Sequence, residues 1–137
     1  ARVEGAPYDF SFSGLKSAVL NHINHAHMMG EEINVPDLMA SFQYAVVDVL
    51  TSHAVEAAKN LGYDKVAIAG GVASNSALRA EMKEACEKAG LKFYYPSPIF
   101  CTDNAAMIGV AGYYEYINGT RSGLDLNAVP NLKLGER

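Results

Sequence analysis

Cysteine is scarce in this chain, which has two cysteines, Cys86 and Cys101, among 137 residues. They form no Cys-x-x-Cys pair and are too few for a disulfide framework. Two free thiols fit a reducing compartment, so we expect a cytoplasmic protein. A cysteine nucleophile requires a histidine base, and the sequence places none beside Cys101. We therefore interpret Cys101 as a small buried residue.

Long apolar runs and an excess of basic residues are also missing. No stretch approaches the length that spans a membrane, and residues 1–5 have no signal-peptide pattern. The 11 Lys and Arg residues and the 15 Asp and Glu residues give a net charge of −4. Proteins that hold nucleic acid alone are usually basic, so such contact requires a local patch or a surface elsewhere. Because the chain has no initiator methionine, we expect a piece of a longer protein.

The stretch from Val66 to Asn75 has the pattern of a buried strand followed by a glycine turn. The apolar run Val66–Ala69 is typical of a strand covered on both faces in a parallel sheet. Gly70 and Gly71 end that strand, and without Cβ atoms they allow a ligand to lie against the backbone. A plain connection between a strand and a helix explains the two glycines as well, because short glycine motifs have many false matches.

A helix follows this turn. Ser74 or Asn75 can cap its N-terminus. Unpaired N–H groups and the positive end of the helix dipole suit a phosphate or another anion at such an N-terminus. Apolar residues at helical spacing give the helix one apolar face, made of Leu78, Met82, Ala85, Cys86 and Ala89.

The rest of the chain indicates further helices and short strands. Alternating aromatic residues predict a half-buried strand, Pro7–Phe12, with Tyr8, Phe10 and Phe12 on one face. In chain order we then expect helices at 15–28 and 36–60, a strand at 91–95, an extended loop at 96–101, a helix from a cap at Thr102 or Asp103 to Gly119, and a packed tail. We predict an α/β fold with a single domain over residues 1–137.

Polar side chains at two predicted helix starts could complete a cleft with the glycine turn. Loops that follow parallel strands meet at one edge of the sheet, so Asp103 would face that turn. Helix capping alone explains Asp103, and the sharper hypothesis is a ligand of a divalent cation beside a bound phosphate. Ser11, Ser13 and Lys16 could form a second polar edge, where Lys16 either meets a phosphate or is simply solvated.

Three histidines on the first predicted helix raise the hypothesis of a metal site. His22 and His25 share a face, whereas His27 points nearly the opposite way. No carboxylate or cysteine is in register until Glu31, so we favour a solvated surface over a metal site. A fourth histidine, His53, is interpreted as a residue at the edge of the core.

Three blocks of sequence make a more specific pattern than the glycine turn alone. They are Tyr-Asp-Phe-Ser-Phe-Ser-Gly-Leu-Lys at 8–16, Ala-Gly-Gly-Val-Ala-Ser-Asn at 69–75 with Leu78-Arg79, and Cys-Thr-Asp-Asn-Ala-Ala-Met-Ile at 101–108. In these blocks the chain resembles the tRNA N6-adenosine threonylcarbamoyltransferase family, formerly called O-sialoglycoprotein endopeptidases or glycoproteases. The likeness extends over almost the whole chain.

The resemblance implies a fold and a set of site residues. It implies the C-terminal lobe of the actin, heat-shock ATPase and sugar-kinase (ASKHA) fold, in which two RNase H-like lobes enclose a nucleotide cleft. By this resemblance, Gly70, Gly71 and Asn75 line the site for the adenylate part of ATP or of threonylcarbamoyl-adenylate. Asp103 would be one ligand of a single metal ion, iron or zinc, which holds and polarises the threonylcarbamoyl group.

The resemblance also implies a reaction and partners. The family transfers the threonylcarbamoyl group to the N6 amino group of the adenosine beside the anticodon, in tRNAs that read codons beginning with A. The partners are therefore tRNA, an inactive paralogue that dimerises with the transferase, and the other proteins of threonylcarbamoyladenosine synthesis.

The chain departs from the family in having no His-x-x-x-His motif, which supplies the other metal ligands from the N-terminal lobe. The polypeptide alone is therefore expected to be inactive, and a lobe without its mate can expose an apolar face and form a homodimer. Two alternatives stay open: an ATP-dependent kinase-like ASKHA enzyme and a non-catalytic dimerisation partner of the transferase. Ser-Phe-Ser-Gly-Leu-Lys at 11–16 and Thr-Asp-Asn-Ala-Ala-Met at 102–107 argue against the kinase, and the intact glycine loop and Asp103 argue against the partner.

Overall fold

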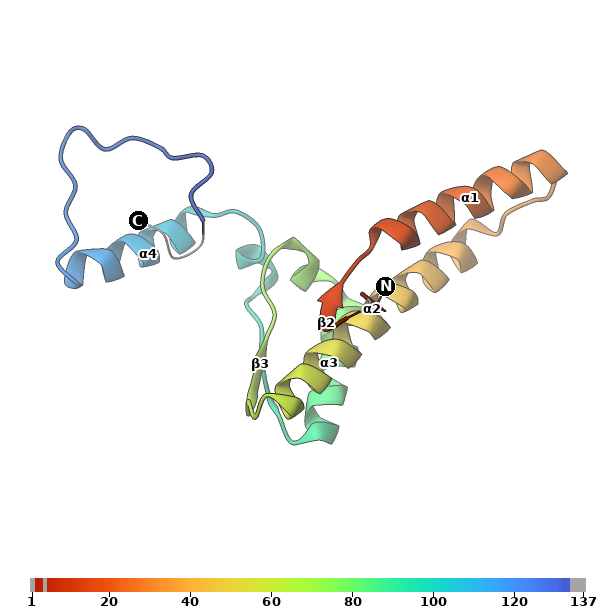
Figure 1. Ribbon diagram of the computed structural model, residues 1–137, viewed down its shortest axis with the longest axis horizontal. Helices are drawn as coiled ribbons and strands as arrows, with labels where there is room; N and C mark the ends of the chain where they lie inside the picture. Colours follow the sequence, from red (N-terminus) through yellow and green to blue (C-terminus); the bar gives the residue numbers. More distant parts are fainter. Residues whose placement is uncertain (1, 4, 134–137) are drawn as a thin grey trace. The chain divides into compact units, whose positions relative to one another are not determined.

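A computed structural model describes residues 2–3 and 5–133 and divides the chain into two compact units, Ala1–Thr102 and Asp103–Arg137. The first unit contains, in order, β1 (Arg2–Val3), β2 (Ala6–Phe10), α1 (Ser13–Met29), α2 (Val35–Asn60), β3 (Lys65–Ala67), the 3₁₀ turn η1 (Gly71–Ser74), α3 (Ser76–Ala89), β4 (Lys92–Tyr94) and the 3₁₀ turn η2 (Pro98–Phe100). The second contains α4 (Ala105–Ile117) (Figure 1). The single domain expected over residues 1–137 stays a prediction.

The helices of the first unit begin and end where their capping residues require. Asn34 caps α2, because its side-chain oxygen accepts a hydrogen bond from the Asp37 N–H at 3.2 Å, and Pro36 lies in the first turn. Gly30 and Gly90 end α1 and α3 in the left-handed conformation, with φ angles of 68° and 70°. The predicted helix boundaries are therefore confirmed to within a few residues.

Two strands of the first unit form the small parallel sheet on which the candidate site lies. β3 pairs with β4, with Val66 opposite Phe93 and Ala67 opposite Tyr94. One more bond, from the Ile68 N–H to the Tyr94 carbonyl at 3.0 Å, continues the pairing beyond β3. The mixed α/β fold and the parallel arrangement are confirmed. Instead of a wholly extended loop, residues 98–100 form η2, because Pro98 has the φ angle of a helical first turn.

The core of the first unit lies among α2, α3 and the β3–β4 sheet. Val47 from α2 packs with Leu78, Met82 and Cys86 from α3, and Met82 and Cys86 are 1% and 0% exposed. Partly buried side chains of both strands, including Val66 and Phe93, pack against this cluster. The apolar face expected for the helix after the glycine turn is thus confirmed, and it fixes α3 beneath the loop that precedes it.

Two features of the first unit concern His53 and the predicted strand 7–12. His53 is 2% exposed and its ring stacks on Phe10 at 5.4 Å, so it is buried, outside the cluster of Val47, Leu78, Met82 and Cys86. Its Nδ1 has no hydrogen-bond partner among the described residues. The predicted strand 7–12 ends at Phe10, and Phe12 serves as the N-cap residue of α1. Because α1 begins at Ser13, the aromatic residues do not all share one strand face.

The second unit consists of α4 and the irregular segment that follows it. Asn104 caps α4 by accepting a hydrogen bond from the Met107 N–H at 3.0 Å, so the prediction of a cap at Thr102 or Asp103 is wrong. The apolar stripe of α4 is exposed at Met107, Val110, Tyr114 and Ile117. The described residues after Gly119 are exposed too, and the packing of the tail along the domain stays a prediction. Among the described residues, no helix is both long enough and apolar enough to cross a membrane.

Candidate functional site

The glycine loop lies directly after β3, at the carboxyl end of the parallel sheet. Gly70 has φ 81° and ψ 176°, a conformation that is essentially restricted to glycine. The chain then turns through η1, in which the Ala73 N–H donates to the Gly70 carbonyl at 3.0 Å. Gly71 has no positive φ, so its own backbone does not require glycine. The two adjacent glycines therefore differ, since only Gly70 is explained by the fold.

Asn75 links the glycine loop to two helices. Its side-chain oxygen accepts a hydrogen bond from the Leu78 N–H at 3.0 Å and thereby caps α3. Its amide nitrogen donates to the side-chain oxygen of Gln43, on α2, at 3.2 Å. A carboxamide has two donor hydrogens and an oxygen with two lone pairs, so Asn75 retains capacity for one further donor and one further acceptor contact. Of the two predicted cap residues, the structure selects Asn75 over Ser74.

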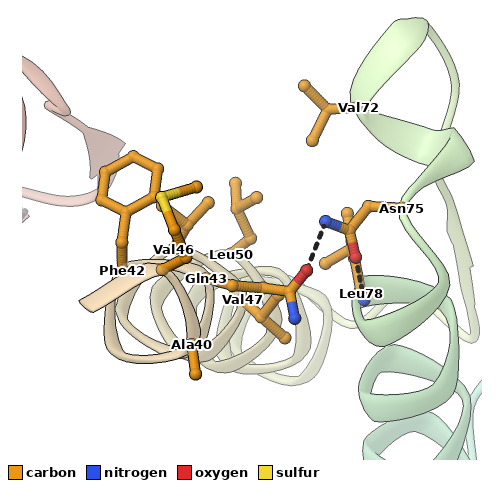
Figure 2. A pocket seen from close by; sticks show the side chains of 10 residues that line it. Ala40, Phe42, Gln43, Val46, Val47, Leu50, Val72, Asn75 and Leu78 are labelled. Atoms are coloured by element: carbon orange, nitrogen blue, oxygen red, sulfur yellow. Dashed lines mark hydrogen bonds between the residues drawn. The ribbon is translucent and has the colours of Figure 1, made fainter. Parts of the chain in front are cut away.

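A cavity of about 350 Å³ lies beside Asn75, between α2 and the loop after β3. Figure 2 shows the side chains of Phe42, Val46 and Leu50 on one side and Val72 on the other, bridged by the Gln43–Asn75 hydrogen bond. The complete lining is Met39, Ala40, Phe42, Gln43, Val46, Val47, Leu50, Val72, Asn75 and Leu78. A mostly apolar cavity with a few polar groups suits a flat ring system that carries hydrogen-bonding atoms at its edge.

Arg79 holds the glycine loop from the other side, a role that we did not assign from the sequence. Its Nε donates to the Ala73 carbonyl in η1, and its Nη2 donates to the Pro96 carbonyl at 2.8 Å. The same Nη2 lies 3.1 Å from the Cys101 Sγ. The motif Leu78-Arg79 contains the residue, but backbone carbonyl partners leave no mark in the sequence by which its contacts could be found.

The two cysteines are both buried. Cys101 is 2% exposed, which confirms its interpretation as a small buried residue. Burial raises the pKa of the Cys86 thiol, so this group is kept in its neutral form within the core. Neither thiol has the exposed setting of a reactive cysteine, and a cation found beside Cys101 is the half-buried Arg79.

Asp103 is the first residue of the second unit, whereas Gly70, Gly71 and Asn75 belong to the first. The common cleft expected for these residues therefore stays a prediction. The Asp103 side chain is exposed, and the α4 cap is its neighbour Asn104. Within the part of the chain that the structure describes, no three His, Cys, Asp or Glu side chains are arranged to hold a metal ion. A metal ion bound by Asp103 therefore stays a prediction.

The other polar candidates are exposed at or along α1. Ser11, Ser13 and Lys16 lie around the start of this helix, and none of them is among the residues that line the cavity beside Asn75. His22 and His25 are exposed further along it, as is His27. A second polar edge of the cleft at Ser11, Ser13 and Lys16 stays a prediction.

Comparison with known proteins assigns the chain to a family. The family model TsaD, described as tRNA N6-adenosine threonylcarbamoyltransferase, matches residues 1–110. The chain belongs to this family. The match includes β3, the glycine loop, Asn75, Arg79 and Asp103, so every site residue discussed above lies within it.

Curated relatives in this family are similar over nearly the whole chain. A tRNA N6-adenosine threonylcarbamoyltransferase of Clostridium botulinum (strain Hall) is 60% identical over 129 residues, which are 94% of this chain. One from Clostridium perfringens (strain SM101) is likewise 60% identical over 129 residues. The chain spans 38% of the length of each of these relatives.

Proposed function

We propose that this chain is the C-terminal part of a tRNA N6-adenosine threonylcarbamoyltransferase, with the ASKHA fold built from RNase H-like lobes. The observation that carries the proposal is the match to this family over residues 1–110, together with 60% identity to its members. The mixed α/β structure with a small parallel sheet is consistent with such a lobe. Because the chain spans 38% of its relatives, the complete reaction needs the part that it does not match.

The adenylate part of threonylcarbamoyl-adenylate, or of ATP, is proposed to bind at the glycine loop. The base would enter the apolar cavity, where the carboxamides of Gln43 and Asn75 offer both donors and acceptors to its edge. The space beside Gly71 is open, because a Cβ atom added there would meet no atom within 4 Å. Without a side chain, Gly71 would let the ligand occupy that space against the backbone. The chain's contribution is to bind and orient the activated group, which raises its effective concentration beside the tRNA.

In the proposed reaction, the N6 amino group of adenosine attacks the carbamoyl carbon of threonylcarbamoyl-adenylate. A C–N bond forms, the bond to the adenylate phosphate oxygen breaks, AMP leaves with the electron pair, and the amine loses a proton. Asp103 is proposed as one ligand of an iron or zinc ion, which supplies a Lewis acid for the carbonyl when bound. One exposed carboxylate does not make a site alone, so the ion would be shared with residues that this chain lacks.

The proposed partners are tRNA, an inactive paralogue, and the other proteins of threonylcarbamoyladenosine synthesis, in the cytoplasm. The net charge of −4 indicates that tRNA is held mainly by surfaces outside this chain. The exposed apolar side chains of α4 are compatible with burial against another surface, so a homodimer of the isolated chain is also proposed.

A transfer assay on the natural gene product at its full length tests the proposal. The protein is supplied with its partners, tRNA and threonylcarbamoyl-adenylate, and modified adenosine is measured by mass spectrometry. We expect the parent and Asp125→Ala to form it, because Asp125 is an exposed aspartate outside the proposed site. Asp103→Ala should abolish the product without unfolding the protein, since Asn104 provides the cap of α4.

Two outcomes would contradict parts of the proposal. Full activity of Asp103→Ala would remove Asp103 from the site and leave the family assignment unchanged. A folded parent that modifies no adenosine in the presence of its partners would contradict the transferase and favour the ATP-dependent kinase-like enzyme.

A further inference from the structure

Arg79 makes hydrogen bonds to the loops after both strands of the parallel sheet. Its Nε bonds to the Ala73 carbonyl in the loop after β3, and its Nη2 to the Pro96 carbonyl in the loop after β4. The Arg79 side chain is half-buried, while its backbone belongs to α3. One guanidinium therefore joins three elements at the edge of the sheet where the glycine loop lies.

The position of this link explains why it matters for the loops. The direct backbone pairing of the two strands reaches the bond between Ile68 and Tyr94. The bonds within η1, such as Ala73 N–H to the Gly70 carbonyl, are local. Local bonds hold the shape of a turn but do not fix its position relative to a neighbouring segment. Arg79 provides that fixed position by bonding to both segments at once.

The chemistry of the contact requires arginine and not merely a positive charge. A guanidinium presents five N–H donors in a rigid planar fork, whereas a lysine ammonium is a compact charge on a flexible stem. The Arg79 Cζ also lies 4.8 Å from the centre of the Tyr95 ring, so the planar group is held over an aromatic face. Lysine could keep one carbonyl bond but could not span both carbonyls and the ring.

The charge of Arg79 is not neutralised by a carboxylate in the structure. Ion pairs found within residues 2–3 and 5–133 include Lys83–Glu87, Lys88–Glu84 and Lys92–Asp64, and none of these three includes Arg79. Its partners are two backbone carbonyls, the Cys101 sulfur and the Tyr95 ring. A positive charge thus remains behind the loop, where it favours an anionic ligand.

We propose that Arg79 is a positioning residue that locks the Gly70–Asn75 loop to the Pro96–Cys101 segment in the geometry that receives the activated ligand. This inference rests on the proposed function, because it assigns the ligand to the glycine loop. The segment that Arg79 holds ends at Cys101, two residues before Asp103 in the sequence.

The test uses Arg79→Lys and Arg79→Met in the natural full-length protein, with Lys83→Met as the matched control. Lys83 lies one turn further along α3, is exposed, and makes an ion pair with Glu87 at 3.9 Å. The first readout needs no activity: the rate at which iodoacetamide alkylates Cys101 in the native protein, located by peptide mass spectrometry. Cys86, buried in the core away from Arg79, is the internal control.

We expect both Arg79 variants to label Cys101 about tenfold faster or more, while Cys86 keeps its parental rate and Lys83→Met behaves as the parent. Hydrogen exchange should become faster in the 70–75 and 96–101 peptides. In the transfer assay, the KM for threonylcarbamoyl-adenylate should rise by about 10- to 100-fold, the scale of a small misplacement of a bound ligand. If Cys86 is also alkylated faster in Arg79→Met, that variant has unfolded, and the result for Arg79→Lys then tests the positioning role.

The outcomes separate this inference from the proposed function. Parental Cys101 labelling and parental KM in a folded Arg79→Lys would overturn the positioning role. Faster Cys101 labelling and loop exchange, in a protein whose parent transfers nothing to tRNA, would support the lock and contradict the transferase instead. A change in KM with kcat retained and the core still protected would not arise from a purely structural loss.

Discussion

Gly70 and Gly71 are adjacent and chemically identical, yet the structure predicts opposite results when each is changed to alanine. At both positions a Cβ would meet no atom within 4 Å, so contacts do not distinguish them. The backbone does, because Gly70 has φ 81° and ψ 176°, whereas Gly71 begins η1 without a positive φ. Any effect of alanine on folding should therefore come from Gly70, and any effect on ligand binding alone from Gly71.

The expected sizes follow from these conformations. Holding alanine in the conformation of Gly70 costs about 1–3 kcal/mol. Replacing glycine by alanine also restricts the unfolded chain, which stabilises the folded state by about 0.4–1 kcal/mol at either position. Gly70→Ala should thus lower the free energy of unfolding by roughly 0–2.6 kcal/mol, about 1.3 kcal/mol at the middle of these ranges, and Gly71→Ala should leave it unchanged or raise it slightly.

The assay combines stability with binding in the natural full-length protein. Native-state hydrogen exchange of the α3 amides gives the local unfolding free energy, and calorimetric titration with ATP gives the affinity of the glycine loop. We expect Gly71→Ala to keep parental exchange but bind ATP more weakly, because its methyl group would occupy the space of the ligand. Equal destabilisation by both variants would refute the backbone argument, and parental ATP affinity in Gly71→Ala would refute the ligand contact.

Three further predictions concern Asn75, Cys86 and Asp103. Asn75→Ala should lower the unfolding free energy by about 1 kcal/mol and Asn75→Ser by only a few tenths, because serine also caps a helix; equal losses in denaturant unfolding would exclude capping as the cause. Burial raises the pKa of the Cys86 thiol in the folded state. The stability that the neutral, buried thiol contributes is therefore complete below the pKa of the thiol in the unfolded chain, about 8.5, and is lost as the pH rises through the pKa in the folded state. The unfolding free energy of the parent should therefore fall relative to Cys86→Ala above about pH 8.5, and a constant difference would contradict this. Asp103→Ala should change the free energy of unfolding by no more than about 0.5 kcal/mol, as expected for an exposed side chain, and a larger loss would indicate a structural role.

The helices and the parallel pair of strands could be predicted from the sequence because their signals are local. Gly30 and Gly90 end helices, and the spacing of Leu78, Met82 and Cys86 defines a buried face, without reference to any distant residue. The predicted N-cap residue of α4 was wrong for an equally local reason. Thr102, Asp103 and Asn104 are all good cap residues, and only the backbone geometry selects Asn104 among them.

The parts of the candidate site that could not be predicted depend on contacts between distant segments. The bond from Asn75 to Gln43 and the bonds from Arg79 to Ala73 and Pro96 join residues 6 to 32 positions apart. Their acceptors are a common amide and backbone carbonyls, which carry no recognisable sequence pattern. The burial of His53 against Phe10 likewise follows from how β2 packs on α2, which periodicity within one helix does not determine.

An exchange of sequence between relatives tests most directly whether this chain supplies part of a threonylcarbamoyltransferase. The 129 matching residues of the Clostridium perfringens relative would be replaced by those of this chain, in cells depleted of their own enzyme. Mass spectrometry of tRNA nucleosides then reports threonylcarbamoyladenosine. We predict that the chimera restores it and that Asp103→Ala in the chimera does not. A chimera that accumulates in folded form with its partners, yet leaves the adenosine unmodified, would contradict the account.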